Sequence, residues 1–202
     1  MQCVVFSNQA KPIGFTIKNS ARKISSLLHH YSRQPALVQR FLEFDRTGEQ
    51  SYLRQAPGHF TASCWLVDAS GEHVLLTHHR KLRRWLQLGG HADGDTDLMR
   101  VALTEAQEES GLLDLSIAPE IFDLDVHEIP ARAEDAAHLH WDVRFVVRAN
   151  GGSNFVTGPE SIALAWVPIR DIVSDQSQRY DDSLRRMALR WIAQANECAS
   201  IP

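Results

Sequence analysis

Apolar residues recur at helical spacing in the first quarter of the chain. One series runs from Ile24 to Tyr31, and a second, after Pro35, runs from Leu37 to Leu42. Spacings of three and four residues place each series on one face of a helix, so the pattern predicts two amphipathic helices that form a hairpin. Their apolar stripes need cover, either from the rest of the chain or from a second copy in a homodimer.

The pattern changes after the residues from Arg46 to Gly58, which contain two Gly and one Pro and are typical of a linker. Residues 59–77 then predict a strand, a turn and a second strand. The same periodicities predict strands at 121–127, 138–147 and 162–167 and helices at 168–173 and 180–196. We therefore expect an N-terminal helical extension at residues 1–57 and a domain of mixed strands and helices at residues 58–202.

A Gly-rich and Asp-rich segment precedes the most informative helix of the chain. The residues from Gly90 to Thr96 predict a loop that ends in a helix N-cap at Asp95 or Thr96. Residues 97–110 lack Gly and Pro and predict a helix, which Gly111 ends.

Three glutamates continue the apolar stripe of this helix. At about 100° per residue, Glu108 and Glu109 fall within about 60° of Glu105, on the side that also carries Leu98 and Leu112. Inward carboxylates repel one another and lose hydration unless a cation neutralises them. A hard divalent ion with oxygen ligands, Mg²⁺ or Mn²⁺, suits this set. The alternative is an ordinary charged helix face at the edge of a domain.

The same residues resemble the box of the Nudix hydrolase family, written G-x5-E-x7-R-E-U-x-E-E-x-G-U with U an aliphatic residue. The matching positions, in register, are Gly90, Glu105, Ala106, Glu108, Glu109, Gly111 and Leu112. Two positions depart from it, because Thr96 stands where the family has Glu and Thr104 where it has Arg. The resemblance covers about residues 58–175. It implies the α/β fold of a Nudix-type α/β/α sandwich with a mixed sheet, here with an N-terminal helical extension.

By this resemblance, Glu105, Glu108 and Glu109 bind Mg²⁺ or Mn²⁺ together with the carbonyl of Gly90. The implied reaction is metal-dependent hydrolysis of a diphosphate linkage in a nucleoside diphosphate derivative, a small-molecule nucleotide substrate. All three glutamates are present, so we expect a working hydrolase.

Two residues are candidates to accept the proton of the attacking water. Glu108 is one, and Glu160 is the other, because several family members use a glutamate in the loop before the late strand as base or as an extra metal ligand. An ordinary loop carboxylate is the other interpretation of Glu160.

Two further functions stay open. The departures at Thr96 and Thr104 are compatible with a catalytically weakened Nudix-fold module that binds a nucleotide without turnover. A prenyl diphosphate isomerase of the same fold ranks below both, since no catalytic Cys is evident near the site.

Basic side chains directly before the acidic loop are candidates for substrate contact. Arg80, Lys81 and Arg83 lie in this segment, and Arg binds phosphate oxygens in a bidentate manner while Lys acts as a point charge. A solvated turn explains any single one of them equally well. His91, in the acidic loop, is a further predicted substrate contact.

The strand predicted at 138–147 has one apolar face and one polar face. The polar face carries His138, His140 and Arg144, and we predict that His140 and Arg144 contact the substrate. His138 and His140 have the spacing that permits joint metal ligation on a strand. No Cys and no other His motif completes such a site, so substrate contact and plain solvent exposure are favoured over zinc.

Composition fits one globular domain with an appendage and narrows the partners. The chain has 202 residues, of which 44% are hydrophobic and 23% charged, and a net charge of −4. Basic residues are spread along the N-terminal part, so no stable nucleic-acid complex is expected. Three cysteines without a CxxC pattern fit a reducing cytoplasm. The lack of a signal-like start or of an apolar run of about 18 residues predicts no membrane association.

Overall fold

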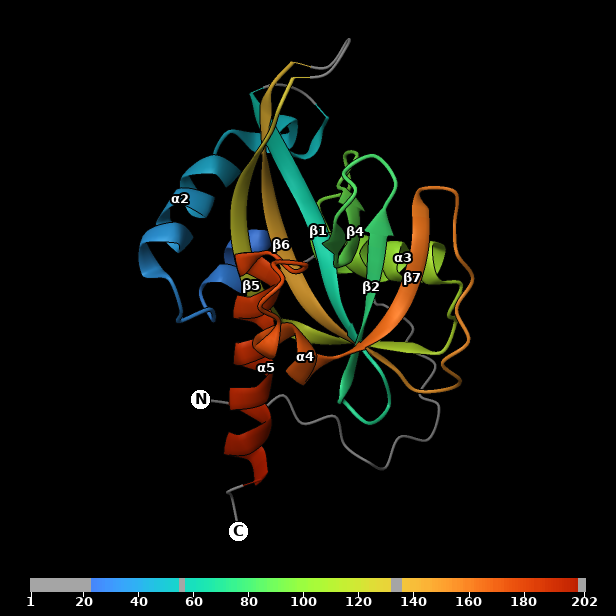
Figure 1. The fold of residues 1–202 in the computed structure, drawn as a ribbon. Coiled ribbons are helices and arrows are strands. Elements are labelled where there is room, and N and C mark those ends of the chain that lie inside the picture. Colours follow the sequence, from blue (N-terminus) through green and yellow to red (C-terminus); the bar gives the residue numbers. More distant parts are fainter. Residues whose placement is uncertain (1–22, 55–56, 132–135, 200–202) are drawn as a thin grey trace.

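The computed structural model describes residues 23–54, 57–131 and 136–199, and it shows a mixed sheet between layers of helices (Figure 1). In the view of Figure 1, the C-terminal helix lies in front of the sheet and the helix of the three glutamates lies behind it. The predicted α/β/α sandwich with a mixed sheet is therefore confirmed.

The described residues form a sheet of seven strands. They are β1 (Gly58–Val67), β2 (His73–His79), β3 (Trp85–Leu86), β4 (Leu88–His91), β5 (Leu115–Ile129), β6 (His138–Ala149) and β7 (Ser161–Pro168). The main path runs β3-β2-β1-β6-β5, with β4 paired to β1 and β7 paired to β2. The β1–β6 pair is parallel and the other pairs are antiparallel, so strands from both ends of the domain meet at the centre.

Two strands share one edge of β1. Strand β2 pairs with it at Val67, whereas β4 pairs with it further toward its start, where Gly90 lies opposite Ala62 and Gly89 opposite Ser63. A Cβ at Gly89 would lie 2.6 Å from the Cα of Ser63, so only glycine permits this approach. The predicted loop is therefore wrong at its first residues: Gly90 and His91 belong to β4, because pairing with β1 overrides the local preference of glycine for loops.

The helix of the glutamates, α3 (Leu98–Ser110), begins one residue later than expected. Its N-cap is Asp97, whose carboxylate accepts a hydrogen bond from the backbone N–H of Arg100 at 3.2 Å, rather than Asp95 or Thr96. Gly111 ends the helix as predicted, in the left-handed region at φ 71°. The opposite face of the sheet is covered by α4 (Ile169–Ser174) and α5 (Asp182–Ala199).

The N-terminal helices are α1 (Ile24–Leu28) and α2 (Pro35–Asp45). Residues of both helices join one apolar cluster with the sheet, and the ring of Phe44 stacks on that of Trp141 of β6 at 4.4 Å between centroids. Phe41 is completely buried and meets Trp141 edge to face at 5.2 Å. The sheet of the same chain thus covers most of the apolar stripes.

The predicted linker is a structured segment over most of its described residues. It contains the 3-10 helix η1 (Gly48–Tyr52), and Tyr52 is only 5% exposed. The hydroxyl of Tyr52 donates a hydrogen bond to the carboxylate of Asp45 at 2.8 Å. The Gly and Pro content therefore marked short turns rather than a free connection.

None of the helices in the described part of the chain is both long and apolar enough to cross a bilayer.

Because α2 shares its core with the sheet, we predict that Phe41→Ala lowers the free energy of unfolding of the whole chain by about 3–5 kcal/mol. Chemical denaturation followed by tryptophan fluorescence measures this change. Gln39→Ala, at an exposed position of the same helix, is the matched control and should change stability by less than about 0.5 kcal/mol. An unchanged main transition in Phe41→Ala would show that the extension folds independently.

Candidate active site

Two glutamates of α3 lie against the glycines of β4. A Cβ at Gly90 would overlap the carboxylate of Glu105, so this carboxylate occupies the space that any other residue at position 90 would fill. One oxygen of Glu109 accepts a hydrogen bond from the backbone N–H of Gly89 at 2.9 Å. The glycine pair therefore fixes both carboxylates at the junction of helix and strand.

These two carboxylates carry negative charge in a partly buried place. Burial raises the pKa of Glu109 to about 7, and the charges of Glu105 and Glu160 add to this effect against the hydrogen bond from Gly89. Burial likewise raises the pKa of Glu105, with Glu108 and Glu160 adding to it. A bound divalent cation would neutralise the charges of these carboxylates and so favour their ionised form. The set of carboxylate oxygens therefore fits Mg²⁺ or Mn²⁺.

Glu108 differs from the other two glutamates because its side chain is exposed. The buried side of α3 is centred on Leu98, Ala102 and Ala106, so Glu108 falls at the edge of the stripe rather than within it. The expectation that all three carboxylates point inward is therefore wrong for Glu108. It is free to meet a ligand from the solvent side.

The loop before β7 brings Glu160 close enough to raise the pKa of both buried glutamates. The position of this loop depends on Arg80, at the end of β2. Its guanidinium donates hydrogen bonds to the carbonyls of Pro159 and Ser161, each at 2.9 Å, and its backbone N–H donates to the carbonyl of Glu160 at 2.9 Å. Arg80, predicted to contact the substrate, is thus engaged in holding the Glu160 loop.

The acidic loop after β4 is held by two bidentate ion pairs. Asp95 pairs with Arg100 of α3, at 2.6 and 2.8 Å. Asp93, in the left-handed region at φ 48°, pairs with Arg54, and one of its oxygens lies 2.7 Å from the guanidinium. The backbone N–H of Gly94 also donates to the carbonyl of Tyr52 at 2.8 Å. The segment that follows η1 therefore anchors the loop.

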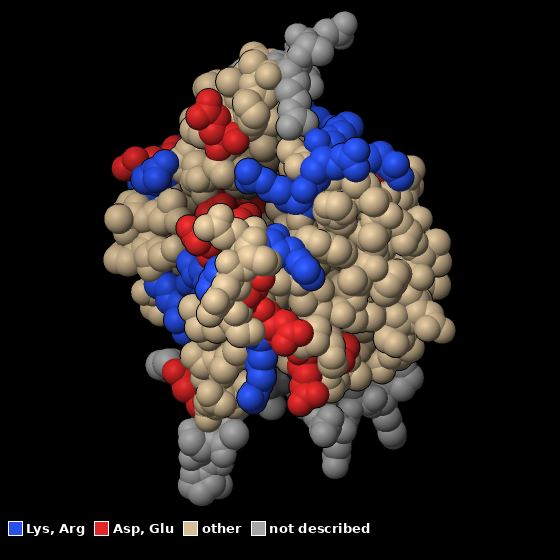
Figure 2. All heavy atoms as spheres, in the orientation of Figure 1, with Lys and Arg blue, Asp and Glu red and all other residues tan. Residues whose placement is uncertain are grey.

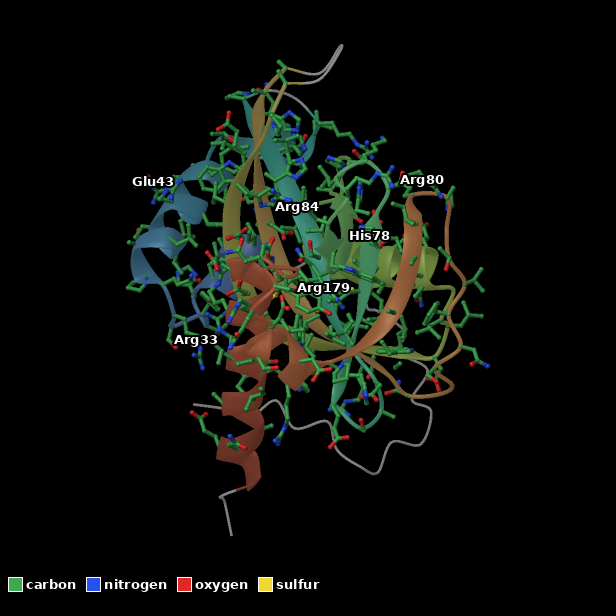
Figure 3. The ribbon with its side chains drawn as sticks, in the orientation of Figure 1. Arg33, Glu43, His78, Arg80, Arg84 and Arg179 are labelled. Carbon is green, nitrogen blue, oxygen red and sulfur yellow. The ribbon has the colours of Figure 1, made fainter. Side chains whose placement is uncertain are left out.

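The other predicted basic contacts lie on the turn after β2. Lys81 and Arg83 are exposed, as is Arg84. Figure 2 shows Lys and Arg side chains gathered over this end of the molecule, and Figure 3 labels Arg80 beside the top of β7. These cations are placed to attract an anionic ligand toward the same end of the sheet as Glu160.

Arg144 lies under α5, not at the surface, and is only 2% exposed. Its guanidinium donates hydrogen bonds to the carboxylates of Asp142 at 2.7 Å, Asp125 at 3.0 Å and Asp123 at 3.2 Å. Burial opposes the charge of Arg144, but these three carboxylates raise its pKa above the usual value. Since its donors are used inside the protein, we leave Arg144 out of the proposed substrate contacts and assign it to joining β5, β6 and α5.

His91 and His140, both predicted substrate contacts, lie together on the sheet with His59 of β1. The ring centroids are 4.9 to 5.0 Å apart in each of the three pairs. Burial lowers the pKa of His91 to about 4, and the charge of Arg54 adds to this effect. Burial and the neighbouring His91 lower the pKa of His140 as well. The lowered pKa values keep the rings of His91 and His140 neutral at pH 7.

Three residues that the structure brings into these groups were absent from the sequence-based prediction. Arg54 was counted as linker, His59 as the first polar residue of a strand, and Asp123 as part of an alternating strand. The spacing of these residues from their partners exceeds any local period, so no pattern along the chain links them.

Comparisons with known proteins identify the family and the fold of this chain. The model of the NUDIX domain matches residues 57–190, and the chain belongs to this family. The crystal structure of a C. elegans Ap4A hydrolase binary complex is similar, with a TM-score of 0.54 and 15% identity over 68% of this chain and 98% of that chain. The MutT protein of Methanosarcina mazei Go1 gives a TM-score of 0.53 and 16% identity, over 67% of this chain and 94% of that chain. Among curated proteins, no match is found.

The raised pKa of Glu109 predicts a measurable effect on stability in the absence of divalent metal. The native state holds the proton more tightly than the unfolded chain, so the ionised carboxylate destabilises the fold increasingly as pH rises from about 4.5 to about 7. In EDTA, Glu109→Gln should therefore be more stable than the wild type at pH 8, by at most about 3 kcal/mol, and equal to it at pH 4. Thermal or urea unfolding across this range measures the difference, and a difference that does not change with pH contradicts the assigned environment.

Proposed function

We propose that this protein is a metal-dependent hydrolase that cleaves a diphosphate linkage in a nucleoside diphosphate derivative. The observation that carries the proposal is the pair of half-buried carboxylates, Glu105 and Glu109, held against the backbone of Gly89 and Gly90. Their raised pKa values mark a place where a divalent cation is needed to balance charge. Family membership supports the same reaction class.

Glu105, Glu109 and the exposed Glu108, together with the carbonyl of Gly90, would hold Mg²⁺ or Mn²⁺. The bound ion would supply charge neutralisation for the phosphates and a lower pKa for an attacking water. The chain's own residues position this chemistry: the glycine pair orients two carboxylates, and Arg100 and Arg54 hold the loop between β4 and α3. The exposed cations Lys81 and Arg83 are proposed to contact the anionic substrate. His91 and His140 are left out of these contacts, because the sheet register turns both rings to the face away from α3 and its carboxylates.

Glu160 and Glu108 are the two proposed proton acceptors. Glu108 lies one turn after Glu105 on α3 and is open to solvent. Glu160 lies on the loop before β7, which Arg80 ties to the end of β2. A carboxylate on such a restrained loop keeps its position relative to the metal ligands, which favours proton transfer at a fixed site.

A nucleotide-binding module without turnover is the second candidate, because Thr96 and Thr104 replace a Glu and an Arg of the family box. The ion pairs of the loop weigh against it. Arg54 with Asp93 and Arg100 with Asp95 hold the loop through charges that the box does not provide. These ion pairs therefore hold the acidic loop in place although Thr96 and Thr104 depart from the family box. A catalytic site needs its loop held in this way.

The similar C. elegans protein is an Ap4A hydrolase, so dinucleoside polyphosphates belong in the first set of substrates to test.

We also propose that the protein works in the cytoplasm, since Cys64 is a free, fully buried thiol and fits a reducing compartment.

The proposal predicts metal-dependent turnover on one class of a panel of nucleoside triphosphates, nucleotide sugars, ADP-ribose, dinucleoside polyphosphates and prenyl diphosphates. Glu105→Gln and Glu109→Gln should each lower kcat/KM by at least about 100-fold, because loss of a ligand should exceed the 10–100-fold cost of losing an outer-shell partner. Glu120→Gln, at an exposed position of β5, is the control. Nucleotide binding without turnover would favour the binding module, and turnover in EDTA would refute the metal assignment.

If Arg80 acts through the Glu160 loop, Arg80→Ala should lower kcat with little change in KM. In the double variant with Glu160→Gln, the two losses should be clearly less than additive, since both remove the same function. Arg170→Ala, at an exposed position of α4, serves as the control for loss of a positive charge. A rise in KM with unchanged kcat would instead make Arg80 a substrate contact.

A further inference from the structure

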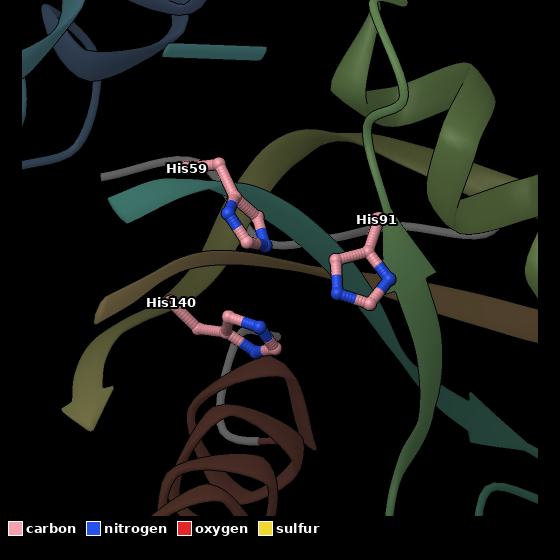
Figure 4. Close-up of side chains that lie close together, drawn as sticks. All are labelled: His59, His91 and His140. Carbon is pink, nitrogen blue, oxygen red and sulfur yellow. The ribbon is translucent and has the colours of Figure 1, made fainter. Parts of the chain in front are cut away.

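Three histidines from three separate strands converge on one face of the sheet. His59 comes from β1, His91 from β4 and His140 from β6, and Figure 4 shows their rings turned toward one another. One ring nitrogen from each lies within 4.8 Å of those of the other two. Five of the ten histidines of the chain gather here, because His138 and His127 border the same group.

The register of the sheet separates this cluster from the carboxylate site. His91 pairs with Thr61 and Gly90 pairs with Ala62, and successive residues of a strand point to opposite faces. Glu105 packs against the face of Gly90 that carries α3, so the ring of His91 lies on the other face. The two groups are neighbours along β4 but occupy opposite sides of the sheet.

The hydrogen bonds of His138 fix its proton and leave a lone pair directed at the cluster. Its Nδ1 lies 2.8 Å from the carbonyl of Ala136, which can only accept, so Nδ1 carries a proton and, in the neutral ring, Nε2 has a free lone pair. This Nε2 lies 3.3 Å from the Nε2 of His140. Two nitrogens bound to one tetrahedral zinc at about 2.0–2.1 Å are separated by about 3.3–3.4 Å.

The chemistry of the cluster favours a borderline transition metal over other ligands. Imidazole nitrogens suit Zn²⁺ and its neighbours, whereas Mg²⁺ and Mn²⁺ prefer the oxygen ligands of the glutamate site. Ordinary core packing is a weaker explanation, because polar rings brought together in a partly buried place lose hydration that apolar side chains would not lose. Sequence spacing alone disfavoured zinc at His138 and His140, and the fold supplies the missing partners, His59 and His91.

We propose that His59, His91 and His140 bind one Zn²⁺ ion, with His138 placed as a fourth ligand. The ion joins β1, β4 and β6 at the end of the sheet where β4 leads into the acidic loop. This site is separate from the proposed Mg²⁺ or Mn²⁺ site, and neither proposal depends on the other.

Metal titration of the untagged, full-length, EDTA-stripped and dialysed protein tests this site. We expect the wild type to bind one equivalent of Zn²⁺ in competition with a chromophoric chelator, and to bind Co²⁺ with the intense visible bands of a tetrahedral site. His140→Gln and His91→Gln should each weaken Zn²⁺ binding by more than about 100-fold, beyond the 10–100-fold cost of losing an outer-shell partner. Zn²⁺ should also raise the melting temperature of the wild type but not that of these variants.

Two controls separate this outcome from failure of the hydrolase proposal. His29→Gln removes an exposed histidine of the N-terminal region and should keep full Zn²⁺ binding. The double variant Glu105→Gln with Glu109→Gln should keep it too, while losing activity with Mg²⁺. Absence of Zn²⁺ binding in the wild type, undiminished binding in His140→Gln and His91→Gln, or its loss in the glutamate variant would each overturn the proposal.

Discussion

The contact between α3 and the glycine pair of β4 is the constraint on which the site depends. Only glycine lets the β4 backbone approach β1 and Glu105 as closely as it does, so a helix carrying carboxylates packs directly on the sheet. This packing half-buries Glu105 and Glu109 and raises the pKa values of both. The fold therefore holds two neighbouring carboxylates in a partly buried place, where their ionisation is unfavourable. A bound divalent cation is the simplest means of neutralising their charge.

The N-terminal segment is part of this arrangement as well as of the core. Phe41 and Phe44 pack on Trp141 in the sheet, and the chain then continues through η1 to Arg54, which clamps Asp93 in the acidic loop. Exposed ion pairs contribute little to global stability, typically below about 1 kcal/mol. The value of this pair lies in restricting the loop beside the carboxylates, at a site where Thr96 and Thr104 stand in place of charged residues of the family box.

Local patterns along the chain were sufficient for most elements and for the acidic helix, because helix and strand periods are properties of neighbouring residues. The end of α3 at Gly111 was predicted correctly from this pattern. The mixed α/β/α fold was predicted correctly from the resemblance to the Nudix family. Strand alternation indicated that Arg144 and Asp142 share a face, but a single strand does not reveal that α5 covers it. Likewise, His59, His91 and His140 lie together because β6 pairs with β1 in parallel and β4 pairs with β1. Both pairings are long-range features that local patterns do not reveal.

The most direct test of the central claim is the position of a bound ion at the carboxylate site. Crystals of the protein soaked in Mn²⁺ would show the ion by its anomalous scattering. The account predicts a peak beside Glu105, Glu109 and the carbonyl of Gly90. The account would be contradicted by a fully occupied Mn²⁺ peak elsewhere in the protein, with no peak beside Glu105, Glu109 and the carbonyl of Gly90.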